Sequence, residues 1–234
     1  MALQIKKAQR SAAKLRMALS GPSGSGKTYT ALTIAAGLGG RIVVIDTEAG
    51  AASLYADQFD FDIGVMEAPF HPHSLADALE ELKGDPPDVV IVDSLSHFWA
   101  GKGGCLELKE QLAIKYKMNP SDYRLWQKLT PIWNRMLDAM LQAPHHVIWC
   151  MRAKQQYVEK KKDDSQPMAS KIGLDPIARP GVEYEADIFC EIDMDHNLII
   201  TKTRCFELTD AVINKPRKEL GERIGKWLKG NNGK

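Results

Sequence analysis

The chain has 234 residues, of which 44% are hydrophobic and 26% charged, a composition that indicates one globular domain with a sizeable core and excludes a wholly disordered chain. The formal net charge is only +1, so a nucleic-acid partner would require a local basic surface. No apolar run reaches the roughly 18 residues of a membrane span, and MALQIKKAQR lacks the apolar stretch of a signal peptide; we therefore expect a cytoplasmic protein without a membrane partner.

Apolar runs alternate with amphipathic stretches up to residue 151, a pattern typical of a mainly parallel sheet covered by helices. Strands are expected at LRMALSG, RIVVID, FDIGVM, DVVIVDS and HHVIWCM, and helices at KTYTALTIAAGL, SLADALEELK and YRLWQKLTPIWNRMLDAML. A long polar loop is expected over residues 152–184. After it, ADIFCEID and NLIITKTR predict a C-terminal antiparallel hairpin, and ELGERIGKWLKG predicts a short amphipathic helix.

The stretch GPSGSGKT lies between the first expected strand and the first expected helix and fits the pattern GxxxxGK[ST]. Its glycines allow the backbone to turn amide groups toward phosphate oxygens, and the N-terminus of the helix adds positive potential. Lys27 is expected to reach the β- and γ-phosphates, and the Thr28 hydroxyl to bind Mg²⁺. The residues expected to bind the nucleotide are Gly21, Pro22, Ser23, Gly24, Ser25, Gly26, Lys27, Thr28 and Tyr29.

Two acidic residues follow other expected strands. VVIVDS brings Asp93 to the carboxyl edge of the sheet, where it can hold the hydration shell of Mg²⁺. Because Ser94 and not a glutamate follows Asp93, the base that activates water must come from elsewhere. Glu48 in RIVVIDTEAG is the expected general base; the alternative is an exposed loop residue.

Taken in order, GPSGSGKT, IDTE followed by Tyr55, and VVIVDS resemble the RecA-type recombinase ATPase core. The resemblance implies a RecA-like P-loop NTPase in which Glu48 is the catalytic glutamate and Tyr55 stacks on the adenine of ATP. It also implies that Arg152 stands at the end of the strand that carries a γ-phosphate-sensing glutamine in RecA. Lys202 and Arg204 would act on the nucleotide of a neighbouring subunit, in a homo-oligomer with nucleotide at its subunit interfaces.

The short RecA-like ATPases of bacteriophages are the most similar group, through DSLSHFW, MRAK and KIGLDPIARPGVEYEAD. Several of them are regarded as single-strand annealing proteins that act beside a single-stranded DNA-binding protein. The resemblance implies a phage-encoded, Mg²⁺-dependent ATPase that promotes annealing or homologous recombination in the host cytoplasm. We expect the ATPase core over 15–213, after a basic N-terminal segment (1–14) and before a C-terminal helix and flexible tail (214–234).

The expected loop over 152–184 mixes basic and aromatic side chains, a combination suited to single-stranded DNA. The candidate DNA-binding residues are Arg152, Lys154, Tyr157, Lys160, Lys161, Lys162, Lys171 and Arg179. The loop also has the position of the second DNA-binding loop of RecA, and a first loop is expected from Trp99 to Gly104. Charge runs usually mark only a solvated surface, which is the alternative interpretation.

Two other functions stay open. A nucleotide-switched adaptor would bind a protein partner and no DNA, and salt-sensitive binding of oligonucleotides would separate it from an annealing protein. A small-molecule kinase is the second, and both the placement of Glu48 and the absence of an arginine-rich lid argue against it.

Overall fold

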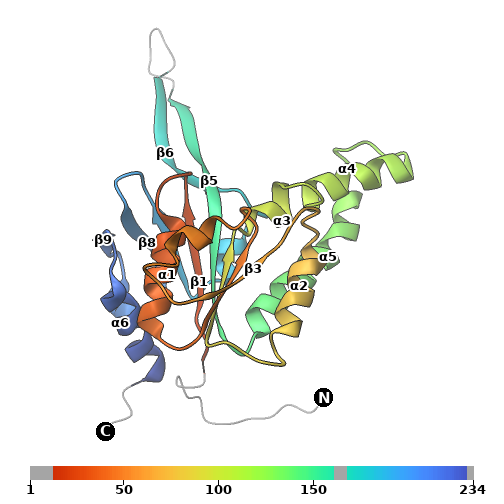
Figure 1. Cartoon of the computed structure of the whole chain (residues 1–234). Helices are drawn as coiled ribbons and strands as arrows, with labels where there is room; N and C mark the ends of the chain where they lie inside the picture. Colours follow the sequence, from red (N-terminus) through yellow and green to blue (C-terminus); the bar gives the residue numbers. More distant parts are fainter. Residues whose placement is uncertain (1–12, 161–167, 231–234) are drawn as a thin grey trace, which may run out of the picture.

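The computed structural model describes residues 13–160 and 168–230; of side chains, those of 155–160 and 168–174 are not described. The described residues form a nine-stranded sheet in the order β3-β2-β4-β5-β1-β7-β8-β9, with β6 paired to β5 (Figure 1). The strands are β1 Arg16–Gly21, β2 Ile42–Asp46, β3 Asp62–Val65, β4 Val89–Asp93, β5 His146–Lys160, β6 Met168–Pro176, β7 Ile188–Ile192, β8 Asn197–Thr203 and β9 Val212–Asn214. The strands from β3 to β7 in this order run parallel, and β8 runs antiparallel to both β7 and β9, so the expected α/β fold with its C-terminal hairpin is confirmed.

Helices cover both faces of the sheet, and each face has its own buried apolar cluster (Figure 1). The helices are α1 Lys27–Leu38, α2 Pro72–Glu81, α3 Ser96–Ala100, α4 Cys105–Tyr116, α5 Arg124–Gln142 and α6 Lys218–Lys229, with 3₁₀ turns η2 Ala51–Tyr55, η3 Val182–Glu185 and η4 Phe206–Leu208. α1 and α6 pack together on one face, and α2 and α5 on the other. The expected apolar stripe of α5 is buried through Leu129 and Trp133, as its helical spacing predicts.

The strand register brings the ends of four parallel strands to one edge of the sheet. Asp46 at the end of β2 is paired with Asp93 at the end of β4, and Gly21 at the end of β1 with Arg152 on β5. Parallel strands flanked by helices bind ligands outside their carboxyl ends, so this edge is where a site is expected.

The prediction of a loop over 152–184 is wrong for much of its length. Beyond Arg152, β5 leaves the sheet and pairs with β6 in an antiparallel ribbon that projects from the body of the protein (Figure 1). Ile177 N–H donates to the Arg152 carbonyl at 2.7 Å, so the base of the ribbon closes at that residue. The sequence of these strands predicts a loop because it lacks the alternation of apolar and polar residues that marks a strand with one buried face.

The expected first DNA-binding loop is also partly helical. Trp99 lies in α3, where its ring stacks on Trp126 of α5 with centroids 5.4 Å apart. Only residues 101–104 connect α3 to α4, a helix that was not expected from the sequence.

The C-terminal helix α6 is part of the core. Leu220, Ile224 and Leu228 are buried against α1. The two helices cross at Gly37 and Gly221, whose Cα atoms approach so closely that a Cβ on Gly37 would lie 2.7 Å from the Gly221 Cα. Among the described residues, no helix is long and apolar enough to cross a membrane.

Candidate functional site

The turn between β1 and α1 has the geometry of a phosphate-binding loop. Gly24 and Gly26 have φ of 82° and 92°, left-handed values that favour glycine, and Gly26 is the N-cap of α1. At Gly21 the reason is space, since a Cβ would lie 2.5 Å from Ser25 Oγ and 2.6 Å from the Ile192 carbonyl oxygen. The backbone therefore curls ahead of the helix N-terminus, an arrangement that favours anions.

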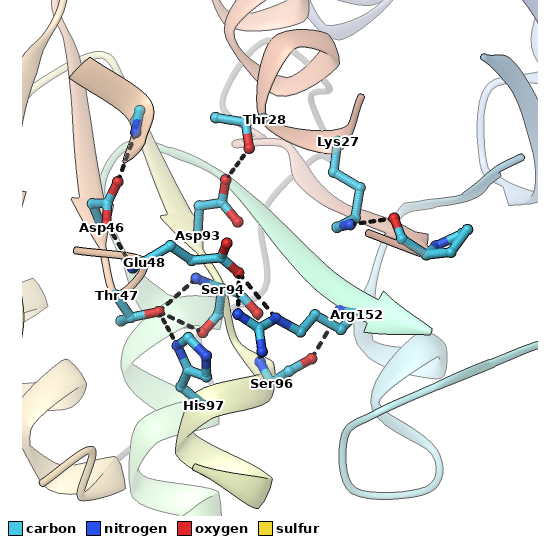
Figure 2. A network of polar contacts seen from close by, with 12 residues as sticks. Lys27, Thr28, Asp46, Thr47, Glu48, Asp93, Ser94, Ser96, His97 and Arg152 are labelled. Carbon is cyan, nitrogen blue, oxygen red and sulfur yellow. Dashed lines mark hydrogen bonds and ion pairs between the residues drawn. The ribbon is translucent and has the colours of Figure 1, made fainter. Parts of the chain in front are cut away.

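Lys27 and Thr28 begin α1 and point to the same edge of the sheet (Figure 2). Lys27 Nζ donates to the Pro22 carbonyl at 2.8 Å. The ammonium group therefore lies against the phosphate-binding loop, where a bound phosphate would also lie. Thr28 Oγ1 donates to Asp93 Oδ2 at 2.5 Å, which brings the two residues predicted as Mg²⁺ ligands into direct contact.

The surroundings of Asp93 fit a divalent cation. Its side chain is buried, and burial raises the pKa of the carboxyl to about 6, against the opposing effect of the Thr28 hydrogen bond; the charges of Glu48 and Asp46 add to the rise. A hydroxyl and a buried carboxylate are hard oxygen donors of the kind that Mg²⁺ prefers. The residues present therefore fit the predicted magnesium site, in which Thr28 and Asp93 would hold the ion.

Asp46 shapes the turn that carries Glu48. Its Oδ1 accepts the N–H groups of Glu48 at 2.6 Å and Gly50 at 3.0 Å, and its Oδ2 accepts Ala52 N–H at 2.9 Å. These three bonds fold the chain after β2 back toward the phosphate-binding loop. Glu48 thus lies at the mouth of the site, where the sequence predicted the general base.

Arg152 pairs with Glu48 across the site, although 104 residues separate them in the chain (Figure 2). Arg152 Nε and a terminal guanidinium nitrogen lie 3.1 and 3.0 Å from Glu48 Oε1. The Arg152 backbone N–H donates to Ser96 Oγ at 2.9 Å, which fixes the main chain while the side chain reaches the carboxylate.

Thr47 and His97 form a second polar layer behind Glu48 (Figure 2). Thr47 Oγ1 lies 2.7 Å from His97 Nδ1 and accepts the Ser94 N–H at 2.7 Å. Burial, followed by the charge of Arg152, lowers the pKa of His97, so the ring is neutral at pH 7. His97 thus contacts the turn that carries Glu48 and ties it to the start of α3.

A family model described as AAA domain matches residues 13–217, nearly the whole of the described core. The chain belongs to this AAA domain family. The match and the loop geometry together make it a P-loop ATPase. No curated protein matches the chain significantly.

Two adjoining cavities open at the P-loop of this AAA domain. The smaller, of about 160 Å³, is lined by the phosphate-binding loop, by Glu48, by the predicted metal ligands Thr28 and Asp93, and by Arg152. The larger, of about 640 Å³, lies beside α1 and is lined by Tyr29, predicted to bind the nucleotide, and by Tyr55, predicted to stack on the base. The cavities share Gly24, Gly26 and Tyr55, so a ligand with a phosphate chain can extend from one into the other.

The predicted DNA-binding residues are spread along the ribbon of the AAA domain. Lys154 is exposed on β5. Tyr157, Lys160 and Lys171 lie on the ribbon strands, and Lys161 and Lys162 lie outside the described residues. Arg179, after the ribbon, donates to Thr130 Oγ1 at 2.9 Å and is therefore held against α5.

Lys202 and Arg204 are far from the P-loop of their own chain. Lys202 lies near the end of β8 and Arg204 just after it, at the edge of the sheet where β1 and β7 begin. Lys202 Nζ donates to the carbonyls of Glu183 at 3.3 Å and Tyr184 at 2.5 Å, and Arg204 pairs with Asp187 at 3.2 Å. Neither residue lines the two cavities at the P-loop.

Sequence reasoning missed several residues of the site. Glu48 and Arg152 are far apart in the sequence, and no local pattern predicts that they form an ion pair. Thr47 and Ser96 belong to no recognised sequence motif. The far wall of the larger cavity comes from His196 and from Lys215–Lys218, a segment expected only to lead into a C-terminal helix.

Proposed function

We propose that this AAA domain hydrolyses ATP with Mg²⁺ and couples hydrolysis to single-stranded DNA held by the β5–β6 ribbon, thereby promoting strand annealing. One observation carries the proposal: Arg152 belongs both to the catalytic site and to the base of the ribbon. A ligand on the ribbon therefore acts on a segment that touches the residue predicted to activate water.

The hydrolytic step is assigned to the residues at the P-loop. The loop amides and Lys27 hold the β- and γ-phosphates, and they stabilise the charge that develops on the transferring phosphoryl group. Glu48 accepts a proton from the attacking water and orients that water in line with the γ-phosphate. Mg²⁺ bound by Thr28 and Asp93 would neutralise phosphate charge.

Arg152 regulates Glu48 in this proposal. Its guanidinium donates to Glu48 Oε1, so one oxygen of the carboxylate is held away from water. The side chains of Glu48 and Arg152 are 33% and 45% exposed, and an ion pair so close to solvent contributes on the order of 1 kcal/mol or less. DNA that binds roughly fivefold more tightly to the state with this ion pair broken is therefore sufficient to shift the equilibrium toward that state.

A homo-oligomer completes the proposal. Lys202 and Arg204 lie at the sheet edge opposite to their own P-loop, so they can stabilise a transferring phosphate only in a neighbouring copy. Their present partners, two carbonyls and Asp187, are replaceable by phosphate oxygens. Oligomer formation would then raise turnover, and turnover per chain would rise with protein concentration.

The test is ATP turnover with and without single-stranded DNA, followed by annealing of two complementary labelled oligonucleotides. We expect DNA to stimulate turnover, and Lys154→Ala with Lys171→Ala to abolish the stimulation and weaken oligonucleotide binding, most strongly at low salt, with a shallower dependence of affinity on salt. The control is Lys226→Ala with Lys229→Ala, which removes the same charge from exposed positions on α6.

Turnover that ignores DNA, together with no oligonucleotide binding at low salt, would overturn the coupling. That result favours the nucleotide-switched adaptor, for which a protein partner on the ribbon would take the place of DNA. Loss of stimulation in both double variants would show a nonspecific charge effect and would also contradict the ribbon assignment.

A further inference from the structure

The larger cavity beside the P-loop has two walls of different chemistry. One is aromatic: the Tyr29 ring meets Tyr55 and Phe59 edge to face, with centroids 5.8 and 5.3 Å away. The other is cationic and comes from Lys215 and Arg217, between β9 and α6, and from Lys218, the first residue of α6. A flat, apolar ring with polar edges fits between such walls, because it can stack on one and accept hydrogen bonds from the other.

The cationic wall is held in place by backbone contacts. Lys215 has φ of 46°, and its N–H donates to the His196 carbonyl at 2.9 Å. The His196 ring in turn lies 2.9 Å, through Nδ1, from the carbonyl of Ser25 in the P-loop. The segment that follows β9 is thus connected to the phosphate-binding loop through a single histidine.

Packing of α6 on α1 fixes the other end of this wall. The glycine crossing at Gly37 and Gly221 allows α6 to approach α1 at backbone distance, and Lys218 is the first residue of α6. The wall is therefore anchored at both ends, by β9 and by α6, and it faces the outer side of α1.

The charges of the wall have no partner within the described residues. Lys215, Arg217 and Lys218 are exposed, form no ion pair with any described side chain, and no carboxylate lines the cavity. Lysine and arginine carry only hydrogen-bond donors. Their natural ligands here are acceptor atoms: ribose oxygens, base carbonyls and ring nitrogens.

We propose that the C-terminal segment Lys215–Lys218 binds the nucleoside half of the nucleotide, with Lys215 and Arg217 donating to its ribose and base while Tyr29, Tyr55 and Phe59 cover its face. The inference rests on the proposed nucleotide site, whose phosphate cavity adjoins this one and shares Gly24, Gly26 and Tyr55 with it. The segment after β9 is then part of the ligand site and no mere connection to a terminal helix.

The experiment compares two ligands by calorimetry in the presence of Mg²⁺: ATP, and inorganic tripolyphosphate, which lacks the nucleoside. We expect Lys215→Ala with Arg217→Ala to weaken ATP binding about tenfold or more, the effect of losing about 1.4 kcal/mol, and to leave tripolyphosphate binding within twofold of the unchanged protein. Lys226→Ala with Lys229→Ala, which removes two charges outside the cavity, should change neither affinity.

Three outcomes would overturn the inference. Unchanged ATP affinity would remove the segment from the site, and equal losses for both ligands would reduce its role to general charge attraction. Weakened oligonucleotide binding with unchanged ATP affinity would assign the wall to DNA. A Lys27→Ala variant separates this inference from the proposed function: if Lys27→Ala abolishes ATP binding while the wall variant does not, only the wall assignment fails. If the unchanged protein does not bind ATP, both fail.

Discussion

The two glycines of α6 provide a matched pair of substitutions. A Cβ on Gly221 would overlap the Ile34 carbonyl oxygen and lie 2.8 Å from the Gly37 Cα, both on α1. A Cβ on Gly225 would meet only the Leu38 Cδ2, at 3.8 Å, which is ordinary contact. Both substitutions replace glycine by alanine within the same helix, so the gain in helix propensity of about 1 kcal/mol is common to them.

Gly221→Ala is expected to destabilise the protein. To relieve the overlap, α6 must move away from α1 and loosen the packing of Leu220, Ile224 and Leu228, at a cost of about 1–3 kcal/mol after the propensity gain. Full loss of these three side chains from the core, at about 1.5–3 kcal/mol each, sets the upper bound. Gly225→Ala should instead stabilise the fold by about 0.5–1 kcal/mol.

Thermal unfolding checks the pair. For a chain of this length 1 kcal/mol corresponds to about 2–4 °C, so Gly221→Ala should lower Tm by about 2–12 °C and Gly225→Ala should raise it by about 1–4 °C. Because α6 anchors the cationic wall, Gly221→Ala should also weaken ATP binding more than tripolyphosphate binding. An equal or higher Tm for Gly221→Ala would refute the close crossing of α1 and α6.

Three further predictions concern the site and the core. Glu48→Gln should keep ATP affinity but lower turnover by about 100-fold or more, because the amide cannot accept the proton; unchanged hydrolysis would remove Glu48 as the base. Arg152→Ala should raise DNA-free turnover toward the stimulated level, and a fall in stimulated turnover with no rise would contradict its restraining role. The third concerns His145, whose ring nitrogens are buried without a partner among the described residues, and whose pKa burial lowers to about 4. The unfolded chain binds this proton near pH 6.5, so stability is fully present above pH 6.5 and falls by about 1.4 kcal/mol per unit between pH 6.5 and 4; His145→Leu, compared by urea unfolding at pH 7 and 5, should reduce that fall.

The sequence predicted which residues meet at this edge of the sheet, because they stand at the ends of buried strands. Apolar runs predict β1, β2 and β4. Because these strands lie parallel in one sheet, their carboxyl ends bring the P-loop, Glu48 and Asp93 together. Motif spacing and sheet geometry agree at these positions. The identities of Lys27 and Thr28 then follow from what a phosphate chain and a hard cation require.

The ribbon and the cationic wall were missed for a different reason. Hydrophobic periodicity reports burial on one face, and the sequence of the outer part of β5 and β6 is too polar to show such a pattern, so it resembles that of a loop. Lys215 and Arg217 are exposed and belong to no motif; their place depends on α6 packing on α1 at Gly37 and Gly221. The sequence does show α6 as an amphipathic helix, but not the surface that its apolar face covers.

Three segments that are distant in the sequence meet around the P-loop. Each contributes one basic side chain, and the three differ in burial and in pairing. Lys27 is buried in the loop itself, Arg152 is held by a weak pair at the base of the ribbon, and Arg217 is exposed on the wall before α6. A bound nucleotide would contact all three segments at once if it filled both cavities, which adjoin and share Gly24, Gly26 and Tyr55 as lining residues. Filling the phosphate cavity places an anion near Arg152, where it competes with Glu48 for the guanidinium. In the proposed mechanism the nucleotide would weaken the Glu48–Arg152 pair without breaking it, and DNA on the ribbon would complete the opening, so both ligands would act on the same ion pair.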